Sequence, residues 1–124
     1  MREEIPECIL GETSSTLFLG YSRSKWVAEQ ICFRAHESMR LHSRIAIFCM
    51  GQLSGDSKRG IWNAKEAWPE VLSSVHLMGC LPALRNEPLS WLPVDIATEA
   101  FVQAVAAMDQ GDDEMKVYHI LNPH

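Results

Sequence analysis

The chain has 124 residues, which suits one domain over residues 1–124, and a domain of this size buries roughly two thirds of the surface that its unfolded chain exposes. The composition is globular, and because 16 acidic residues outnumber 11 unclustered basic ones, a nucleic-acid-binding surface is not expected. No run of about 18 apolar residues and no basic leader occur, so we expect a cytoplasmic protein that does not contact a membrane.

The first predicted element is a helix over residues 21–40, where good helix formers dominate and neither proline nor glycine occurs. Apolar residues recur there at helical spacing and predict the face that packs on the core: Ala28, Ile31, Cys32, Ala35 and Met39. Residues 44–50, RIAIFCM, form a nearly continuous apolar run before Gly51, which is typical of a strand covered on both faces in a parallel sheet.

The following segment, residues 63–79, reads as helical on either side of Pro69, which fits a first turn or a break. LSWLPV is a short extended piece. Asp95 is predicted as the N-cap of the next helix, because its carboxylate can accept hydrogen bonds from the open amides of a first turn. Apolar residues then repeat at helical spacing as far as Met108, and Gly111 is predicted to cap that helix.

Residues 116–121, KVYHIL, predict a closing strand. The order of elements is therefore helix, strand, helix, short extended piece, helix and strand. We expect the strands at residues 44–50 and 116–121 to be parallel neighbours joined by a right-handed crossover. The fold class is α/β with a small sheet.

The cysteines predict neither a disulfide framework nor a metal site, because no C-x-x-C pair occurs among Cys8, Cys32, Cys49 and Cys80. Cys32 and Cys49 lie in apolar segments and are interpreted as small, reduced core residues. Cys32 and His36 could share a helix face, but a metal ion needs more ligands than these two.

Tyr21 and Lys25 lie four residues apart at the start of the first helix, so one helical turn places them on one face. A phenol has a pKa near 10, and matching it to neutral pH requires ~3 pKa units, or ~4 kcal/mol. An ammonium ~4 Å away in an effective dielectric of ~20 supplies about that much. Such a pair could protonate a carbonyl oxygen during reduction. On this spacing alone, an ordinary surface helix is the simpler interpretation.

Five stretches change that balance: GYSRSKWVAEQ, GQLSGDSKRGIWNAKEAWPEVL, LPAL, LSWLPVDIATEAF and VYHILNPH. Together they resemble the C-terminal half of a terminal thioester reductase domain, as found in fungal polyketide synthases, nonribosomal peptide synthetases and carboxylic acid reductases. Such domains are extended short-chain dehydrogenase/reductases. The resemblance implies a partial Rossmann-like fold, made of the C-terminal strands and helices plus a small substrate-binding lobe at residues 60–92.

The resemblance also implies roles for individual residues. Tyr21 and Lys25 match the family's catalytic pair, which also contacts the cofactor. The segment that passes near the nicotinamide end of NADPH is matched by Gly51, Gln52 and Leu53. The substrate-binding lobe, which faces the thioester and its phosphopantetheine arm, is matched by Trp62 and Asn63. No metal is implied.

Family members reduce an acyl thioester, bound to an acyl or peptidyl carrier protein, to an aldehyde and in some cases to an alcohol. Here the seven glycines form neither G-x-x-G-x-x-G nor G-x-G-x-x-G, so the loop that holds the cofactor's pyrophosphate is absent. We therefore expect a fragment of an NADPH-dependent reductase that is inactive until an N-terminal half completes it. Its strand would have an open apolar edge, which favours association with that half or with itself.

Two alternatives remain. One is a non-catalytic module that retains the substrate lobe and binds a carrier protein or a partner subunit. The other is a different extended reductase, such as a sugar epimerase, which shares the Y-x-x-x-K spacing. The stretch GIWNAKEAWPEVL favours the thioester group.

Overall fold

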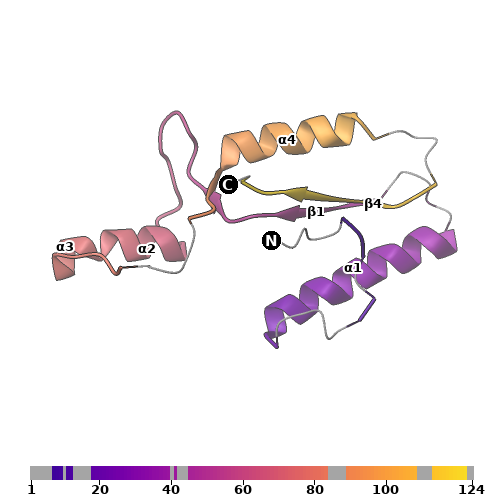
Figure 1. Cartoon of the computed structure of the whole chain (residues 1–124), viewed down its shortest axis with the longest axis horizontal. Helices are drawn as coiled ribbons and strands as arrows, with labels where there is room; N and C mark the ends of the chain where they lie inside the picture. The colour runs from indigo at the N-terminus through magenta and orange to yellow at the C-terminus, as the bar shows by residue number, and fades with distance from the viewer. Residues whose placement is uncertain are drawn as a thin grey trace, which may run out of the picture. The chain divides into compact units, whose positions relative to one another are not determined.

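The computed structural model describes residues 7–9, 11–12, 18–39, 41, 45–83, 89–108 and 113–122. The predicted cap at Gly111 and the residues Arg40 and Arg44 lie outside these ranges. Helices and strands alternate along the chain (Figure 1), in the order α1 (Gly20–Met39), β1 (Ala46–Met50), β2 (Leu53–Ser54), α2 (Ala67–Ser73), α3 (Val75–Met78), β3 (Leu92–Pro93), α4 (Val94–Ala106) and β4 (Lys116–Ile120). The mixed α/β class is therefore confirmed.

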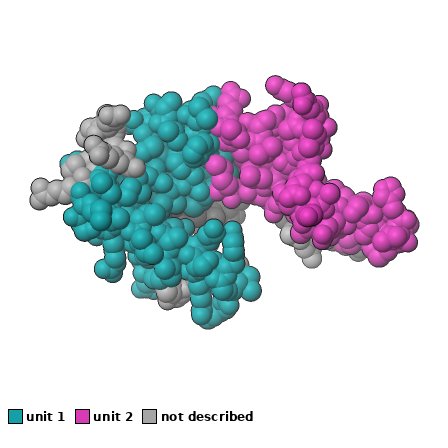
Figure 2. Space-filling view, turned by 180° about the vertical axis from the view of Figure 1, so that it is seen from behind, with its two compact units in different colours: residues 1–49, 101–120 teal, residues 50–100, 121–124 magenta. Residues whose placement is uncertain are grey.

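The chain divides into two compact units, coloured separately in Figure 2. Unit 1 consists of Met1–Cys49 and Phe101–Ile120, and unit 2 consists of Met50–Ala100 and Leu121–His124. The boundary falls inside β1 and again inside α4. The segment expected to form the substrate lobe, residues 60–92, belongs wholly to unit 2.

Unit 1 contains a two-stranded sheet of β1 and β4. The two strands run in the same direction, with α1 along one face and the C-terminal part of α4 along the other (Figure 1). This confirms the predicted pairing of the two apolar strands. Aromatic packing joins these elements, because the Phe48 ring in β1 lies 4.6 Å from the Phe101 ring in α4 and 5.0 Å from the Tyr118 ring in β4, between ring centroids.

The packed face of α1 differs from the predicted one. Ile31 and Met39 are 63% and 69% exposed, so the predicted stripe does not form the buried face. Partly buried positions include Trp26 and Phe33, which lie almost opposite the predicted stripe, and two members of that stripe, Cys32 and Ala35. Burying two large aromatic rings removes more apolar surface from water than burying a stripe that includes two small alanines, which favours the face that carries the rings. None of the described residues of α1 is fully buried.

Unit 2 contains a second parallel pair, in which Leu53 of β2 pairs with Leu92 of β3 and Ser54 with Pro93. Pro69 lies in the first turn of α2, where its missing N–H leaves no helical bond unmade, as predicted. The short α3 ends at Gly79, whose φ of 69° is left-handed and whose N–H donates to the Val75 carbonyl at 2.8 Å.

The core of the described residues is small. Four apolar side chains are buried in it, namely those of Leu92, Ala97, Val117 and Ile120. Among the residues described, no helix has the length and apolar character needed to cross a bilayer.

Candidate functional site

Tyr21 and Lys25 share one face of α1, as their spacing predicts. The Lys25 Nζ lies 5.1 Å from the centroid of the Tyr21 ring, within the usual range of a cation–π contact. A side-chain hydrogen bond stabilises this first turn, in which the Ser24 hydroxyl donates to the Tyr21 carbonyl at 2.7 Å. The Tyr21 side chain is 73% exposed. The phenol and the ammonium are thus held together, but they face water.

The segment expected near the nicotinamide lies at the start of unit 2. The carbonyl of Gln52 accepts a hydrogen bond from the Leu92 N–H at 2.9 Å, and the Gln52 side-chain amide donates to the Leu53 carbonyl at 3.2 Å. Leu53 is paired in β2, and Gly51 is partly buried before it. The parallel pairing with β3 therefore holds the backbone of this segment in place.

A tight loop follows β2 and is organised by the carboxylate of Asp56. That carboxylate accepts hydrogen bonds from the backbone N–H groups of Lys58, Arg59 and Ile61, at 3.1, 2.7 and 3.1 Å. Gly60 completes the loop with a φ of 65°, a left-handed conformation that glycine adopts without strain. The conformation of this loop is therefore set by its own side chains.

A second carboxylate ties the loop to α4. Asp95 accepts hydrogen bonds from the Ser57 N–H at 2.9 Å and from the Ser57 hydroxyl at 2.6 Å. These two bonds, the hydroxyl first, lower the pKa of the Asp95 carboxyl below its usual value. Asp95 lies within the first turn of α4, which begins at Val94, and not at the predicted N-cap position, but backbone N–H groups of that turn, those of Asp95 and Ile96, also lower the pKa of its carboxyl, as an acceptor role implies.

Trp62 and Asn63, the expected substrate residues, follow this loop. The Trp62 indole N–H donates to a Glu66 carboxylate oxygen at 3.0 Å, and its ring packs edge-on against Trp91 with centroids 5.2 Å apart. The Asn63 side-chain oxygen accepts from the Lys65 N–H at 3.1 Å, in a turn that leads into α2. Both residues thus have structural contacts of their own.

The structure brings the expected residues together in two groups. Tyr21 and Lys25 belong to unit 1, whereas the expected cofactor segment 51–53 and the expected substrate residues 62–63 belong to unit 2.

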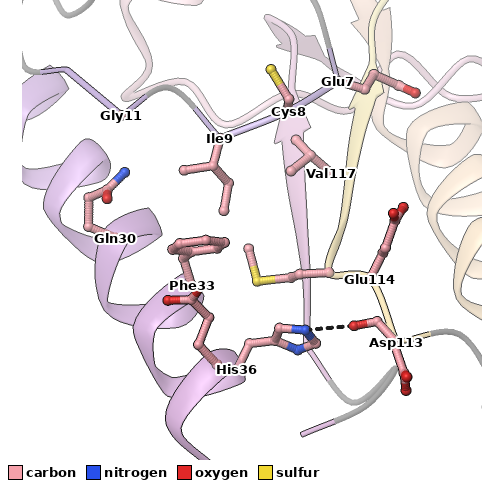
Figure 3. A pocket seen from close by; sticks show the side chains of 12 residues that line it. Glu7, Cys8, Ile9, Gly11, Gln30, Phe33, His36, Asp113, Glu114 and Val117 are labelled. Carbon is pink, nitrogen blue, oxygen red and sulfur yellow. Dashed lines mark hydrogen bonds between the residues drawn. The ribbon is translucent and has the colours of Figure 1, made fainter. Parts of the chain in front are cut away.

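Unit 1 also contains a pocket of about 740 Å³ between α1, residues 7–9 and 11, and the segment that leads into β4 (Figure 3). Phe33, Ile9 and Val117 give it an apolar wall. The His36 Nε2–H donates to the Asp113 carbonyl at 3.0 Å, since a carbonyl oxygen can only accept, and this assigns the ring tautomer. The other ring nitrogen, Nδ1, is buried and has no hydrogen-bond partner among the described residues.

In the part of the chain that is described, no three or more His, Cys, Asp or Glu side chains lie close enough together to hold a metal ion. The four cysteines are free. Cys49 in β1 is partly buried, and burial together with the nearby Glu29 charge raises the pKa of its thiol. Cys32 and Cys49, the two interpreted as core residues, are each partly buried.

The residues fit a nicotinamide dinucleotide only in part. Its pyrophosphate needs a glycine whose backbone a phosphate can approach. Gly55 cannot serve, because a Cβ at that position would lie 2.8 Å from the Ile61 carbonyl oxygen, which shows that the Ile61 backbone already occupies the space. Gly60 and Gly79 lie in a turn and at a helix end. The side chains of Tyr21 and Lys25 are exposed at the start of α1.

A tyrosine and a lysine share one helix face within a small α/β fold of parallel strands, so nicotinamide-dependent α/β proteins are the class to compare. Residues 3–101 match the model of the NAD_binding_4 family, described as "Male sterility protein". The chain belongs to this NAD-binding, Rossmann-like family.

The curated relatives include a reductase, a polyketide synthase and a peptide synthetase of fungi. The chain is 33% identical over 119 residues to an adenylate-forming reductase of Aspergillus terreus, and this covers 96% of the chain and 11% of the relative. It is 34% identical over 110 residues to the non-reducing polyketide synthase SAT8 of Stachybotrys chartarum, and this covers 89% of the chain and 4% of the relative. It is 33% identical over 120 residues to the non-ribosomal peptide synthetase ascB of Acremonium egyptiacum, covering 96% and 10%.

The chain therefore spans about a tenth or less of the length of these relatives. No solved structure gives a significant match. The resemblance to reductase domains of polyketide and peptide synthases, first drawn from the five stretches of sequence, is confirmed, and so is the membership of an NAD-binding reductase family.

Proposed function

We propose that this chain supplies the proton donor and the substrate-facing segment of an NADPH-dependent reductase domain, which reduces an acyl thioester on a carrier protein to an aldehyde or an alcohol. The observation that carries the proposal is the contact between the Lys25 ammonium and the Tyr21 ring, at 5.1 Å on one helix face, in a chain of an NAD-binding family. In this reaction a nicotinamide supplies hydride.

The chemistry of Tyr21 follows from its position. When a carbonyl carbon accepts hydride, negative charge develops on the oxygen, and a phenol within hydrogen-bond reach can donate its proton to that oxygen. The Lys25 ammonium beside the ring stabilises the phenolate that results. Gly51, Gln52 and Leu53 are assigned to the cofactor's nicotinamide side, and Trp62 and Asn63 to the substrate.

The described residues support a reductase that is incomplete without further structure. Tyr21 is open to water, and general acid catalysis works best where water is excluded. On the same helix, Ile31 and Met39 expose apolar side chains. No glycine loop for the pyrophosphate occurs in the sequence. We infer that a nucleotide-binding half covers this face of α1, and that the 124 residues alone do not turn over substrate.

A chimera tests the proposal. The matching 119-residue segment of the Aspergillus terreus reductase is replaced by this chain, and NADPH oxidation is followed with a carrier-bound acyl thioester. We expect turnover, and we expect Tyr21→Phe and Lys25→Met each to lower kcat by about 10²–10⁴-fold, the usual contribution of general acid catalysis. Tyr118→Phe, which removes a hydroxyl from the other tyrosine of the chain, is the control and should leave kcat unchanged.

An active chimera in which Tyr21→Phe has no effect on kcat would reject the catalytic assignment. Saturable NADPH binding at micromolar concentration by the 124 residues alone would reject the inferred need for a nucleotide-binding half.

A second candidate is a non-catalytic module that binds a carrier protein or a partner subunit. The absence of a glycine fingerprint favours it. This candidate predicts that carrier binding, measured by calorimetry, is the same for the native chain and for Tyr21→Phe, and that the chimera shows no NADPH oxidation.

A further inference from the structure

An apolar pocket of about 370 Å³ lies within unit 2, in the segment expected to form the substrate lobe but without Trp62 or Asn63 in its lining. One wall comes from α2 and consists of Trp68, Val71 and Leu72. The facing wall consists of Leu81, Leu89 and Trp91. The described side chains that line the pocket are all apolar, so this part of the lining favours an uncharged ligand.

The aromatic wall of the pocket is fixed in position before any ligand arrives. The Trp91 ring packs edge-on against the rings of Trp62 and Trp68, with centroids 5.2 Å apart in both pairs. The Trp91 carbonyl accepts a hydrogen bond from the Asn122 side chain at 2.8 Å. An indole held on two sides and at its backbone does not swing into the space, so the pocket stays open.

The size and lining of the pocket indicate an aromatic ligand. A cavity of roughly 150 Å³ holds one benzene ring. The volume here leaves room for two fused rings. Two indoles in the wall favour rings over saturated groups of the same size, because aromatic pairs gain from edge-to-face and offset contacts as well as from burial.

We propose that the Trp68–Trp91 pocket binds an uncharged aromatic ring system of one or two rings. This inference rests on the proposed reductase function. It implies that the substrate is an aryl thioester whose rings lie between α2 and the segment at residues 89–91.

The test uses the full chain, without NADPH, and two probes with the same carbon skeleton. They are the N-acetylcysteamine thioesters of 2-naphthoic acid and of its saturated form, decahydro-2-naphthoic acid. Binding is followed by the four indole N–H signals in ¹⁵N NMR spectra, assigned with Trp26→Phe, Trp62→Phe and Trp68→Phe. We expect the naphthoyl probe to shift the signals of Trp68 and Trp91 and to leave Trp26, in α1, unchanged, and to bind at least tenfold more tightly than the saturated probe.

Two variants check the location. Leu72→Asp places a charge at the rim of the pocket and should weaken naphthoyl binding at least tenfold, whereas Leu77→Asp, on a 91% exposed residue of α3 outside the pocket, should not. Dispersed indole signals show that each variant is folded. If Leu72→Asp is not folded, Leu72→Ala replaces it, with about threefold weaker binding expected.

Equal affinity for the two probes would overturn the aromatic assignment. The location would be overturned if the signals of Trp68 and Trp91 did not shift. It would also be overturned if the Leu72 variants bound the naphthoyl probe as tightly as the native chain. The results of this binding test can be distinguished from the results of the chimera test of the proposed function. A chimera that reduces thioesters while Trp68 and Trp91 remain unperturbed retains the reductase and rejects this pocket. Naphthoyl binding at Trp68 and Trp91 together with an inactive chimera retains the pocket and rejects the reductase.

Discussion

The carboxylate of Asp95 accepts two hydrogen bonds from a single residue, Ser57, one from its backbone N–H and one from its hydroxyl. The loop that Asp56 organises is thereby fastened to the first turn of α4. Because the expected substrate residues follow directly after this loop, its attachment determines how rigidly that part of unit 2 is held.

The first prediction concerns pH. Because the folded chain lowers the pKa of Asp95, its carboxylate stabilises the fold fully above about pH 3.9, the value for an unfolded aspartate, and loses this contribution as the pH falls through the lower folded value. We expect Asp95→Asn to lower the urea midpoint at pH 7 and the difference from the native chain to shrink below about pH 4.

Urea titrations at pH 7, 5 and 3 measure this difference. Ser57→Ala should reproduce part of the loss, and the double variant should lose less than the sum of the two single variants, since the residues share one interaction. A midpoint difference that stays constant from pH 7 to pH 3 would contradict the assignment.

The second prediction concerns Gly55. A Cβ there would meet the Ile61 carbonyl oxygen at 2.8 Å and the Trp62 Cβ at 3.1 Å, so Gly55→Ala forces the loop to move. We expect a loss of about 1–3 kcal/mol in the free energy of unfolding, measured by denaturant titration. Gly20→Ala is the matched control, because no atom lies within 4 Å of a Cβ built there. It should be neutral or stabilise by up to about 1 kcal/mol. Equal effects of the two substitutions would show that the close approach is not real.

The third prediction concerns the aromatic packing of unit 1. Phe48 contacts both Phe101 and Tyr118, and Phe48→Ala should destabilise the chain by about 3 kcal/mol, at the low end for such a truncation because the ring is only partly buried. Phe18→Ala, on a side chain that is 92% exposed, should change the stability by less than about 0.5 kcal/mol. Thermal unfolding of both variants, side by side, measures the contrast. A similar loss for the two would argue against a shared core of these three rings.

The fourth prediction concerns thiol reactivity. Burial and the Glu29 charge raise the pKa of Cys49, which lowers its thiolate fraction at pH 8. Cys8 and Cys80 are exposed. We expect iodoacetamide to label Cys8 and Cys80 well before Cys49, as read by peptide mass spectrometry after timed quenching. Denaturation should remove the difference, and early labelling of Cys49 in the folded chain would contradict its described environment.

Local pattern was enough to predict the main elements of the fold. α1, α4, β1 and β4 each extend over at least five residues, which is long enough for helical spacing or an apolar run to be visible. The pairing of β2 with β3 was not predicted, because each strand has two residues and no periodicity can appear in so short a segment. The packed face of α1 was predicted only in part, because Cys32 and Ala35 are partly buried while Ile31 and Met39 are exposed, and the choice of face depends on partners distant in sequence.

In the candidate site, too, contacts between residues close in sequence could be predicted and contacts between distant residues could not. One helical turn fixes the relation of Tyr21 to Lys25, so their contact followed from spacing alone. The bond from Ser57 to Asp95 joins residues 38 positions apart, and no local signal distinguishes it from an N-cap. The pocket wall of Trp68 and Trp91 likewise depends on how α2 folds back toward β3, and the sequence only displays three tryptophans in one stretch.

The bond from the Asn122 side chain to the Trp91 carbonyl has a practical consequence for handling the protein. A shortened variant that stops at Leu121 would lose the amide that anchors this tryptophan, although the cut lies far along the chain from the indole it affects. Fluorescence of such a trimmed variant should report a loosened tryptophan environment, and affinity tags are therefore better appended beyond residue 124 than substituted for the final residues.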